Sequence, residues 1–179
     1  MRLLQEEFTL SSTQEPDSDQ GGSTNMPKRR DLIRMDEDAL WEFIGSQKTV
    51  QVGTLNPDGS IHLVPLWFAL DGRCIVLETF SKSQKVKNLE RNPNITLLFE
   101  DGTEYTQLRG ASLSAQAELV QDVEAVHRYH CRVIGRNQPE LSKEVIEQVS
   151  RGMAPKKTAI LVRPDKVMSW DHSKLDGIY

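Results

Sequence analysis

The chain has 179 residues, of which 37% are hydrophobic and 27% are charged, and its net charge at pH 7 is −4. This composition fits one ordinary globular domain and excludes collagen-like, coiled-coil and globally disordered proteins. No apolar run approaches the ~18–20 residues that cross a bilayer, and the small negative charge gives no reason to expect nucleic acid as a partner.

The negative charge is concentrated in residues 1–25, which contain five acidic residues and one basic residue, so the rest of the chain is neutral overall. Residues 11–25 lack apolar periodicity, and such a segment cannot offset the entropy lost on ordering. We therefore expect a disordered acidic tail at residues 1–26 and one domain at residues 27–179. Met26 could be the functional start, or the tail could belong to the native protein, and the sequence leaves both open.

The first predicted elements are a helix over residues 36–45 and three strands over residues 49–55, 60–69 and 73–79. Asp36 can cap the helix at its N-terminus, because a carboxylate there accepts from a free backbone N–H. The strands alternate in apolar character, and Asn-Pro-Asp-Gly and Asp-Gly turn sequences join them. This pattern predicts an antiparallel meander.

The next segment predicts a short helix over residues 81–91, which stops at an Asn-Pro pair, and a strand over residues 94–100. Residues 105–120 are typical of one long strand or of two strands, and a bulge is expected at Gly110. Because this part of the chain again has period-two patterning, it extends the β-structure of the first meander.

Two helices over residues 122–134 and 139–152 and two strands over residues 158–163 and 166–170 complete the chain. One face of the second helix is expected to be buried: Leu141, Val145, Val149 and Met153. Six or seven strands without βαβ alternation predict a mainly β fold. We expect a small closed or split β-barrel with peripheral helices, since closure removes exposed strand edges.

The segment from Thr79 to Lys85 combines the end of a strand, a hydroxyl-rich turn and the start of a helix. Free N–H groups at a helix N-terminus bind anions, and hydroxyl and ammonium donors strengthen such a site. One phosphate could accept from all of these side chains: Thr79, Ser81, Lys82, Ser83 and Lys85. The other interpretation, in which Ser81 only caps the helix and the lysines are solvated, stays open.

Trp67 follows Pro65 on the predicted strand beside this segment. Pro65 cannot donate to a β-ladder, so it is expected at an edge, at a bulge or where another group approaches the backbone. A flat aromatic wall beside a planar ligand is one role for Trp67, and core packing is the other.

His127, His130 and Cys131 lie at positions i, i+3 and i+4 of a predicted helix. That spacing can hold a metal, but the sequence fixes no carboxylate or further ligand nearby. We therefore expect no metal and a surface or interface role for these side chains. The chain has two cysteines far apart, which do not form a disulfide framework, so a cytoplasmic location is expected.

Residues 79–99 resemble the pyridoxamine 5′-phosphate oxidase-like split-barrel flavoproteins. That family has a strand-ending Thr, then Ser-Arg-Lys at the start of a helix, then Asn-Pro and another strand. This chain has the same spacing without a gap: Thr79, then Ser83-Gln84-Lys85, then Asn92-Pro93. The resemblance extends over roughly residues 35–120, and a weaker similarity covers residues 158–172.

The resemblance implies an FMN-binding-like split barrel in which Thr79, Ser83 and Lys85 hold the phosphate of a flavin-type cofactor. Gln84 takes the place of the family's Arg. The resemblance also implies a homodimer with two cofactor sites at the subunit interface.

One branch of the family fits this chain better than the others. Oxidase members carry an Arg and a Lys on the strand before the site, whereas residues 62–67 contain neither. Pro65-Leu66-Trp67 and the Ser-Trp-Asp-His sequence at residues 169–172 look like the flavin/deazaflavin oxidoreductase branch, whose members use FMN or coenzyme F-420. In that branch the backbone around residues 65–67 would lie along the ring system.

The function implied by this resemblance is an FMN- or F-420-dependent oxidoreductase. It would transfer a hydride to or from a small conjugated substrate and would not oxidise pyridoxamine phosphate. No catalytic acid or base is assigned, because hydride transfer from a bound cofactor need not use one. Two alternatives remain, a non-catalytic carrier of a flavin, haem or tetrapyrrole and a protein that keeps the fold without the cofactor site.

Overall fold

The computed structural model describes residues 29–175, and the predicted acidic tail at residues 1–26 lies outside these described residues. The strands are β1 (Thr49–Leu55), β2 (Ile61–Asp71), β3 (Cys74–Phe80), β4 (Asn94–Asp101), β5 (Arg109–Val120), β6 (Lys157–Val162) and β7 (Lys166–Asp171). The helices are α1 (Arg29–Leu32), α2 (Glu37–Ser46), α3 (Gln84–Arg91), α4 (Val123–Asn137) and α5 (Lys143–Met153). Short 3₁₀ turns lie at Tyr105–Gln107, Ala154–Lys156 and His172–Leu175.

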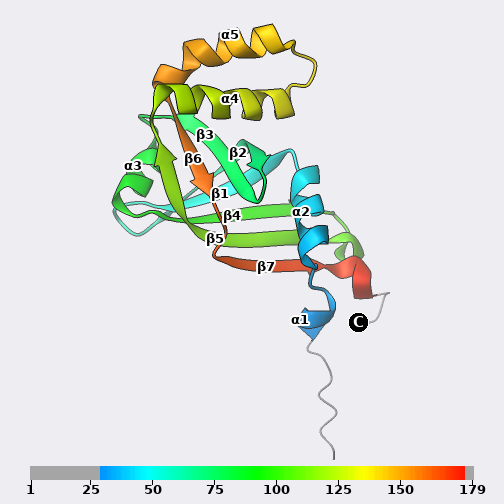
Figure 1. Cartoon of the computed structure of the whole chain (residues 1–179). Helices are drawn as coiled ribbons and strands as arrows, with labels where there is room; N and C mark the ends of the chain where they lie inside the picture. Colours follow the sequence, from blue (N-terminus) through cyan, green and yellow to red (C-terminus); the bar gives the residue numbers. More distant parts are fainter. Residues whose placement is uncertain (1–28, 176–179) are drawn as a thin grey trace, which may run out of the picture.

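The seven strands form one antiparallel sheet in the order β4-β1-β2-β3-β6-β5-β7 (Figure 1). Because β4 also pairs with β5, six strands close into a barrel, and β7 pairs with the first half of β5. Inward-facing side chains such as those of Val52, Leu97 and Leu113 fill the barrel. Phe68 and Phe99 meet edge to face inside it, with 5.1 Å between ring centroids. The predicted barrel with peripheral helices is confirmed.

The barrel is split between β2 and β3. Their pairing runs only from Phe68↔Leu77 to the turn, and the first seven residues of β2 pair with β1 alone. Continuing the register would set Leu66 opposite Thr79, but no ladder forms there. Pro65 lies in this stretch, where β2 has only one neighbour and a missing N–H costs least. The expectation that Pro65 lies at an edge is confirmed.

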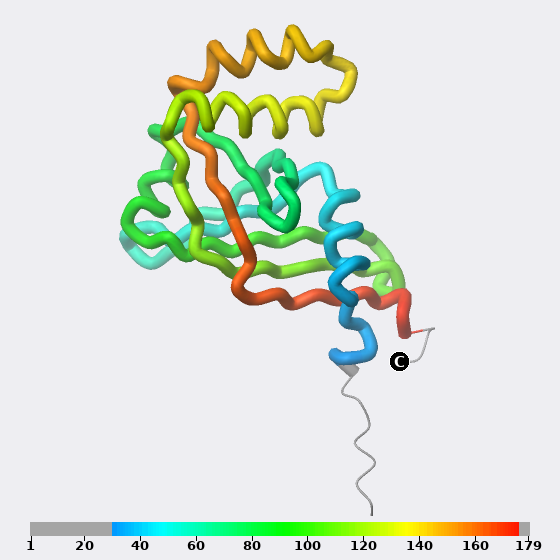
Figure 2. The backbone as a smooth tube through the Cα atoms, viewed as in Figure 1, coloured from blue at the N-terminus to red at the C-terminus, as the bar shows by residue number. Residues whose placement is uncertain are grey.

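The α4–α5 pair lies on the opposite side of the molecule from the two ends of the described chain (Figure 2). α4 packs on β2, β3 and β6, and α5 packs on α4 as the outermost layer. The only fully buried residue of α5 is Ser150, whereas Val145 and Val149 are 42% and 44% exposed. The expected burial of these two valines is therefore wrong, because nothing in the described chain covers that face.

One other local expectation fails. Gly110 pairs regularly with Glu100 on β4 and with Trp170 on β7, so there is no bulge at this position. The residue is glycine for a different reason, which is that the indole of Trp170 occupies the space of a side chain. Within residues 29–175, none of the helices has both the length and the apolar character that a bilayer span requires.

Candidate functional site

Three of the residues expected to bind phosphate meet where β3 ends and α3 begins. Thr79 is buried at the end of β3, and Ser83 is the N-cap residue of α3, although its side chain makes no capping hydrogen bond. Lys85 Nζ donates to Thr79 Oγ1 at 3.2 Å, and Thr79 Oγ1 donates to Ser83 Oγ at 3.4 Å. These three side chains, which we call the Thr79–Lys85 group, form one polar cluster at the first turn of the helix.

Lys85 is buried without an acidic partner. Its exposed fraction is 9%, and no ion pair joins it to a carboxylate within the part of the chain that the structure describes. The pKa of Lys85 is lowered, first because burial removes hydration from the ammonium group and second because the charge of Lys157 lies nearby. A buried ammonium that lacks a counter-charge is stabilised by any anion that reaches it. The environment of Lys85 therefore favours an anionic ligand.

Lys157 is a second buried cation beside this group, and sequence reasoning did not identify it. Its Nζ lies 3.0 Å from Glu78 Oε2 and 4.1 Å from the centroid of the Phe80 ring. Only 10% of the Lys157 side chain and 12% of the Glu78 side chain are exposed. Because the carboxylate of Glu78 offsets the positive charge of Lys157, Lys85 is the cation of this pair that remains available to an anionic ligand.

Ser81 does not cap the helix, which contradicts one of the two interpretations of this segment. Its backbone N–H donates to Lys156 O at 3.0 Å, and its Oγ accepts from Thr158 Oγ1 at 3.0 Å. Both contacts hold the turn against β6. Ser81 is therefore bound to a neighbouring strand and is not a member of the Thr79–Lys85 group.

Gln84 is exposed, and its side chain turns along the helix. Its Nε2 donates to Asn88 Oδ1 at 2.9 Å, so the amide supports Asn88 and does not point toward Thr79. Asn88 itself is fully buried, and its Nδ2 donates to Thr54 Oγ1 at 3.1 Å and to Asn56 Oδ1 at 2.9 Å. These bonds fix α3 against the end of β1.

Asn88 was missed from the sequence, although a signal was present. It lies between the apolar residues Val86 and Leu89, which are buried, and a polar side chain on that face requires partners. Lys85 lies one turn earlier on the same helix. The position of Lys85 therefore depends on how Asn88 attaches α3 to the barrel.

Pro65 and Trp67 lie on the outer face of β2, opposite Gln51 and Thr49 of β1. Trp67 is 39% exposed, so the core-packing interpretation of this residue is wrong. Among the described residues, no hydrogen bond or ring contact joins Pro65 or Trp67 to the Thr79–Lys85 group. Pro65 and Trp67 therefore lie on β2 and Thr79 lies on β3, and these are the two strands that border the split.

The outer face that carries Trp67 is apolar and hollowed. A groove of ≈ 450 Å³ runs over β1, β2 and β4, and its lining includes Gly53, Leu55, Ile61, Leu63 and Leu98. A larger hollow of ≈ 930 Å³ lies beside α2, with both acidic and basic residues in its walls. Neither hollow contains a residue of the Thr79–Lys85 group.

Comparison with known proteins places this fold and sequence in one family. The family model described as pyridoxamine 5′-phosphate oxidase matches residues 36–171. A conserved hypothetical protein from Mycobacterium tuberculosis has a crystal structure that superposes with a TM-score of 0.78 at 36% identity, covering 85% of this chain and 94% of that chain. No curated protein matches the sequence.

More distant structures share the fold. An F-420 reductase superposes with a TM-score of 0.57 at 20% identity, covering 70% of this chain and 93% of that chain. HutZ, a haem storage protein from Vibrio cholerae, superposes with a TM-score of 0.57 at 18% identity, covering 76% and 97%. The family match over most of the chain is the decisive finding, and the chain belongs to the pyridoxamine 5′-phosphate oxidase family.

Proposed function

We propose that the protein is an oxidoreductase that binds FMN or the deazaflavin coenzyme F-420 and transfers a hydride to or from a small conjugated substrate. The observation that carries this proposal is the environment of Lys85, which is buried at the start of α3 beside two hydroxyl groups and has no acidic partner in the described chain. Such a site is suited to a phosphate, which both cofactors carry.

The residues present fit a phosphate group. Lys85 supplies a positive charge, Thr79 and Ser83 supply hydroxyl donors, and the first turn of α3 has backbone N–H groups with no partner inside the helix. The Ser83 side chain does not cap these N–H groups, so a ligand can accept from them. Charge-assisted hydrogen bonds of this kind are among the strongest in proteins.

The chain's own residues would bind and orient the cofactor and would exclude water from it. Asn88 holds α3 in place, and the outer face of β2 around Pro65 and Trp67 offers an apolar surface for a planar ring. Bound FMN or F-420 would supply the hydride chemistry itself. We assign no acid or base to the reaction.

The lack of an Arg or Lys between residues 62 and 67 argues against pyridoxamine phosphate as the substrate. On the part of β2 that borders the split, Leu66 and Trp67 lie on opposite faces of the strand, and both are neutral. A second phosphate on a substrate would find no cation on that strand. A neutral, conjugated substrate fits this surface better.

We also propose that the protein acts as a homodimer. Ile61 and Leu63 are 71% and 64% exposed on the outer face of β2, and Leu55 lies beside Ile61 on β1. Exposed apolar surface of this kind is typical of an interface. A second copy covering it would lie against Pro65 and Trp67 and would close the ring-binding region from water.

The proposal is tested by titrating the purified full-length protein with FMN and with F-420 and following fluorescence. Binding of one of them at micromolar concentration or tighter, with competition by excess inorganic phosphate, supports the proposal. An absorption spectrum dominated by bound haem, with binding of neither flavin-type cofactor, would favour the carrier alternative. Binding of none of these ligands would favour a protein that keeps the fold without the site.

A further inference from the structure

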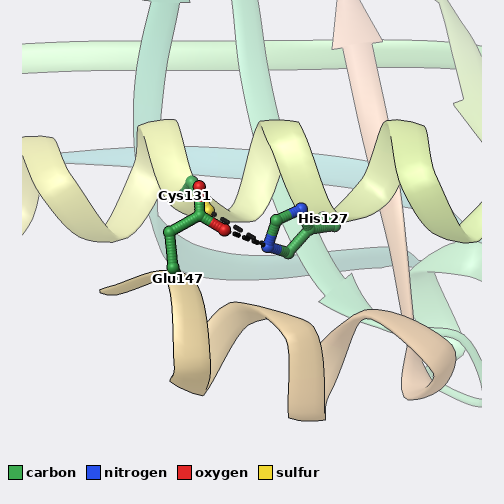
Figure 3. Close-up of side chains that lie close together, drawn as sticks. All are labelled: His127, Cys131 and Glu147. Atoms are coloured by element: carbon green, nitrogen blue, oxygen red, sulfur yellow. Dashed lines mark hydrogen bonds and ion pairs between the residues drawn. The ribbon is translucent and has the colours of Figure 1, made fainter. Parts of the chain in front are cut away.

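The fold places three metal-binding side chains together between α4 and α5. His127 and Cys131 lie one turn apart on α4, and both point toward Glu147 of α5 (Figure 3). His127 Nε2 lies 2.9 Å from Glu147 Oε2 and 3.6 Å from Cys131 Sγ. The donor atoms of all three side chains lie within 4.8 Å of one another. The expectation of no metal rested on the lack of a further ligand, and the fold supplies one from a different helix.

The spacing of these atoms fits one small tetrahedral ion. Zinc bonds of about 2.0 Å to nitrogen and oxygen and about 2.3 Å to sulfur place a nitrogen about 3.5 Å from a sulfur and about 3.3 Å from an oxygen. The observed separations from His127 Nε2, 3.6 Å to sulfur and 2.9 Å to oxygen, differ from these values by a few tenths of an ångström. A tetrahedral ion therefore needs only small side-chain adjustments.

The three donor atoms indicate which metal this site would hold. One imidazole, one thiolate and one carboxylate form a borderline-soft set that suits zinc and disfavours magnesium and calcium, which prefer oxygen ligands alone. We propose that His127, Cys131 and Glu147 bind one Zn²⁺ ion, with the fourth position taken by water.

The surroundings allow an ion to enter and be neutralised. His127 is buried, Cys131 is half-buried, and 58% of the Glu147 side chain is exposed, so the site opens toward solvent on the α5 side. A thiolate and a carboxylate together offset the two positive charges of the ion. Arg151 lies 4.0 Å from Glu147 Oε2 and 3.9 Å from Glu124 Oε1, and exposed ion pairs of this kind are weak enough for a metal to displace.

The position of the site gives the metal a structural role. α5 is held to the rest of the chain by few buried side chains, since Ser150 is its only fully buried residue and Val145 and Val149 face outward. A metal that joins Glu147 to two residues of α4 would cross-link the helix pair. No residue of the Thr79–Lys85 group takes part, so this inference stands independently of the proposed function.

The test uses full-length protein without a tag, stripped of metal and then dialysed against Zn²⁺, with the metal content measured by elemental analysis. We expect one Zn²⁺ per chain at micromolar free metal. Even second-shell changes weaken metal sites by about 10–100-fold, so Cys131→Ser and Glu147→Gln should each weaken binding at least about tenfold. Glu144→Gln, on the same helix and exposed, should bind as the unchanged protein does.

A spectroscopic measurement identifies the sulfur ligand. Replacing Zn²⁺ by Co²⁺ should give a thiolate-to-cobalt charge-transfer band in the unchanged protein and in Cys74→Ser, and no such band in Cys131→Ser. Added Zn²⁺ should also raise the melting temperature of the unchanged protein more than that of Glu147→Gln, because a ligand that binds only the folded state stabilises it according to its affinity.

Two results would overturn the proposal. The first is the absence of stoichiometric zinc and of the cobalt band in the unchanged protein, which would leave His127 and Glu147 as a simple polar contact between the two helices. The second is a Cys131→Ser protein that keeps its zinc affinity. The first result needs no variant, so it decides the matter even if a substitution prevents folding.

Discussion

The indole of Trp170 on β7 lies directly against the backbone of Gly110 on β5. A Cβ atom at position 110 would lie 2.1 Å from Trp170 Cζ2, so any side chain there requires the indole to move. We expect Gly110→Ala to lower the free energy of unfolding by about 1–3 kcal/mol, the usual cost of overpacking. Urea denaturation followed by circular dichroism measures this loss.

A matched control is available on α5. Apart from its chain neighbours and the backbone of its own helix, nothing lies within 4 Å of a Cβ built at Gly152, and the residue is helical. Gly152→Ala should leave stability unchanged or raise it by up to about 1 kcal/mol, since alanine is the better helix former. Similar effects of the two substitutions would show that Trp170 does not restrict position 110.

The attachment of α3 through Asn88 gives a second prediction. Asn88→Ala removes three side-chain hydrogen bonds at a fully buried residue and leaves Thr54 and Asn56 without the donors that Asn88 supplied. We expect the free energy of unfolding to fall by about 1–3 kcal/mol, because buried polar groups left unpaired keep their desolvation cost. The same denaturation experiment on Lys87→Ala, an exposed position of the same helix, should show little change, and an equally small effect of Asn88→Ala would refute this role.

The lowered pKa of Lys85 predicts how stability depends on pH. Between the folded pKa and the ordinary lysine value of 10.5, the unfolded chain holds a proton that the folded chain has lost, so stability rises with pH in that window. Below the window, folding buries a charged ammonium at a cost. Lys85→Met removes this cost and should stabilise the cofactor-free protein at neutral pH, with the gain shrinking as the pH approaches 10.5.

This prediction is checked by chemical denaturation of both proteins at a series of pH values. The control is Lys82→Met, which changes an exposed lysine in the same turn and should show a small difference at every pH. If the stability gained by Lys85→Met stays constant or grows as the pH rises, the ammonium of Lys85 is not buried without a compensating charge.

The outer apolar face of β2 predicts the oligomeric state. If a second copy covers this face, the unchanged protein should be a dimer by light scattering, and Leu63→Glu should convert it to a folded monomer by placing a charge in the interface. Val145→Glu changes an exposed valine on α5 and should leave the dimer intact. A monomeric unchanged protein, or a dimer unaffected by Leu63→Glu, would contradict the proposed interface.

Local patterning was sufficient to predict most of the fold. The α2 helix begins where Asp36 indicated, with its Oδ1 accepting from Ala39 N at 2.9 Å. Gly59 and Gly72 occupy the tight turns with positive φ, as the Asn-Pro-Asp-Gly and Asp-Gly sequences indicated. These features depend on neighbours within a few residues, and such neighbours are visible in a sequence.

The features that the sequence did not reveal all depend on contacts between distant segments. Gly110 is explained by Trp170, sixty residues later, and Lys157 reaches the site only because β6 pairs with β3. Glu147 joins His127 because α5 folds back on α4, which no helical spacing encodes. The exposure of Val145 shows the converse, since an apolar stripe at helical spacing does not say whether anything covers it.

The most direct test of the central claim is the affinity of the protein for FMN and F-420, the proposed phosphate-bearing cofactors, measured by calorimetry for the unchanged protein, Lys85→Ala and Lys82→Ala. Loss of a hydrogen bond to a charged group costs about 1.5–3 kcal/mol, so Lys85→Ala should weaken binding of FMN or F-420 roughly ten- to hundredfold. Lys82→Ala should bind nearly as the unchanged protein does. Equal affinities for all three proteins would contradict the assignment of Lys85 to the phosphate site.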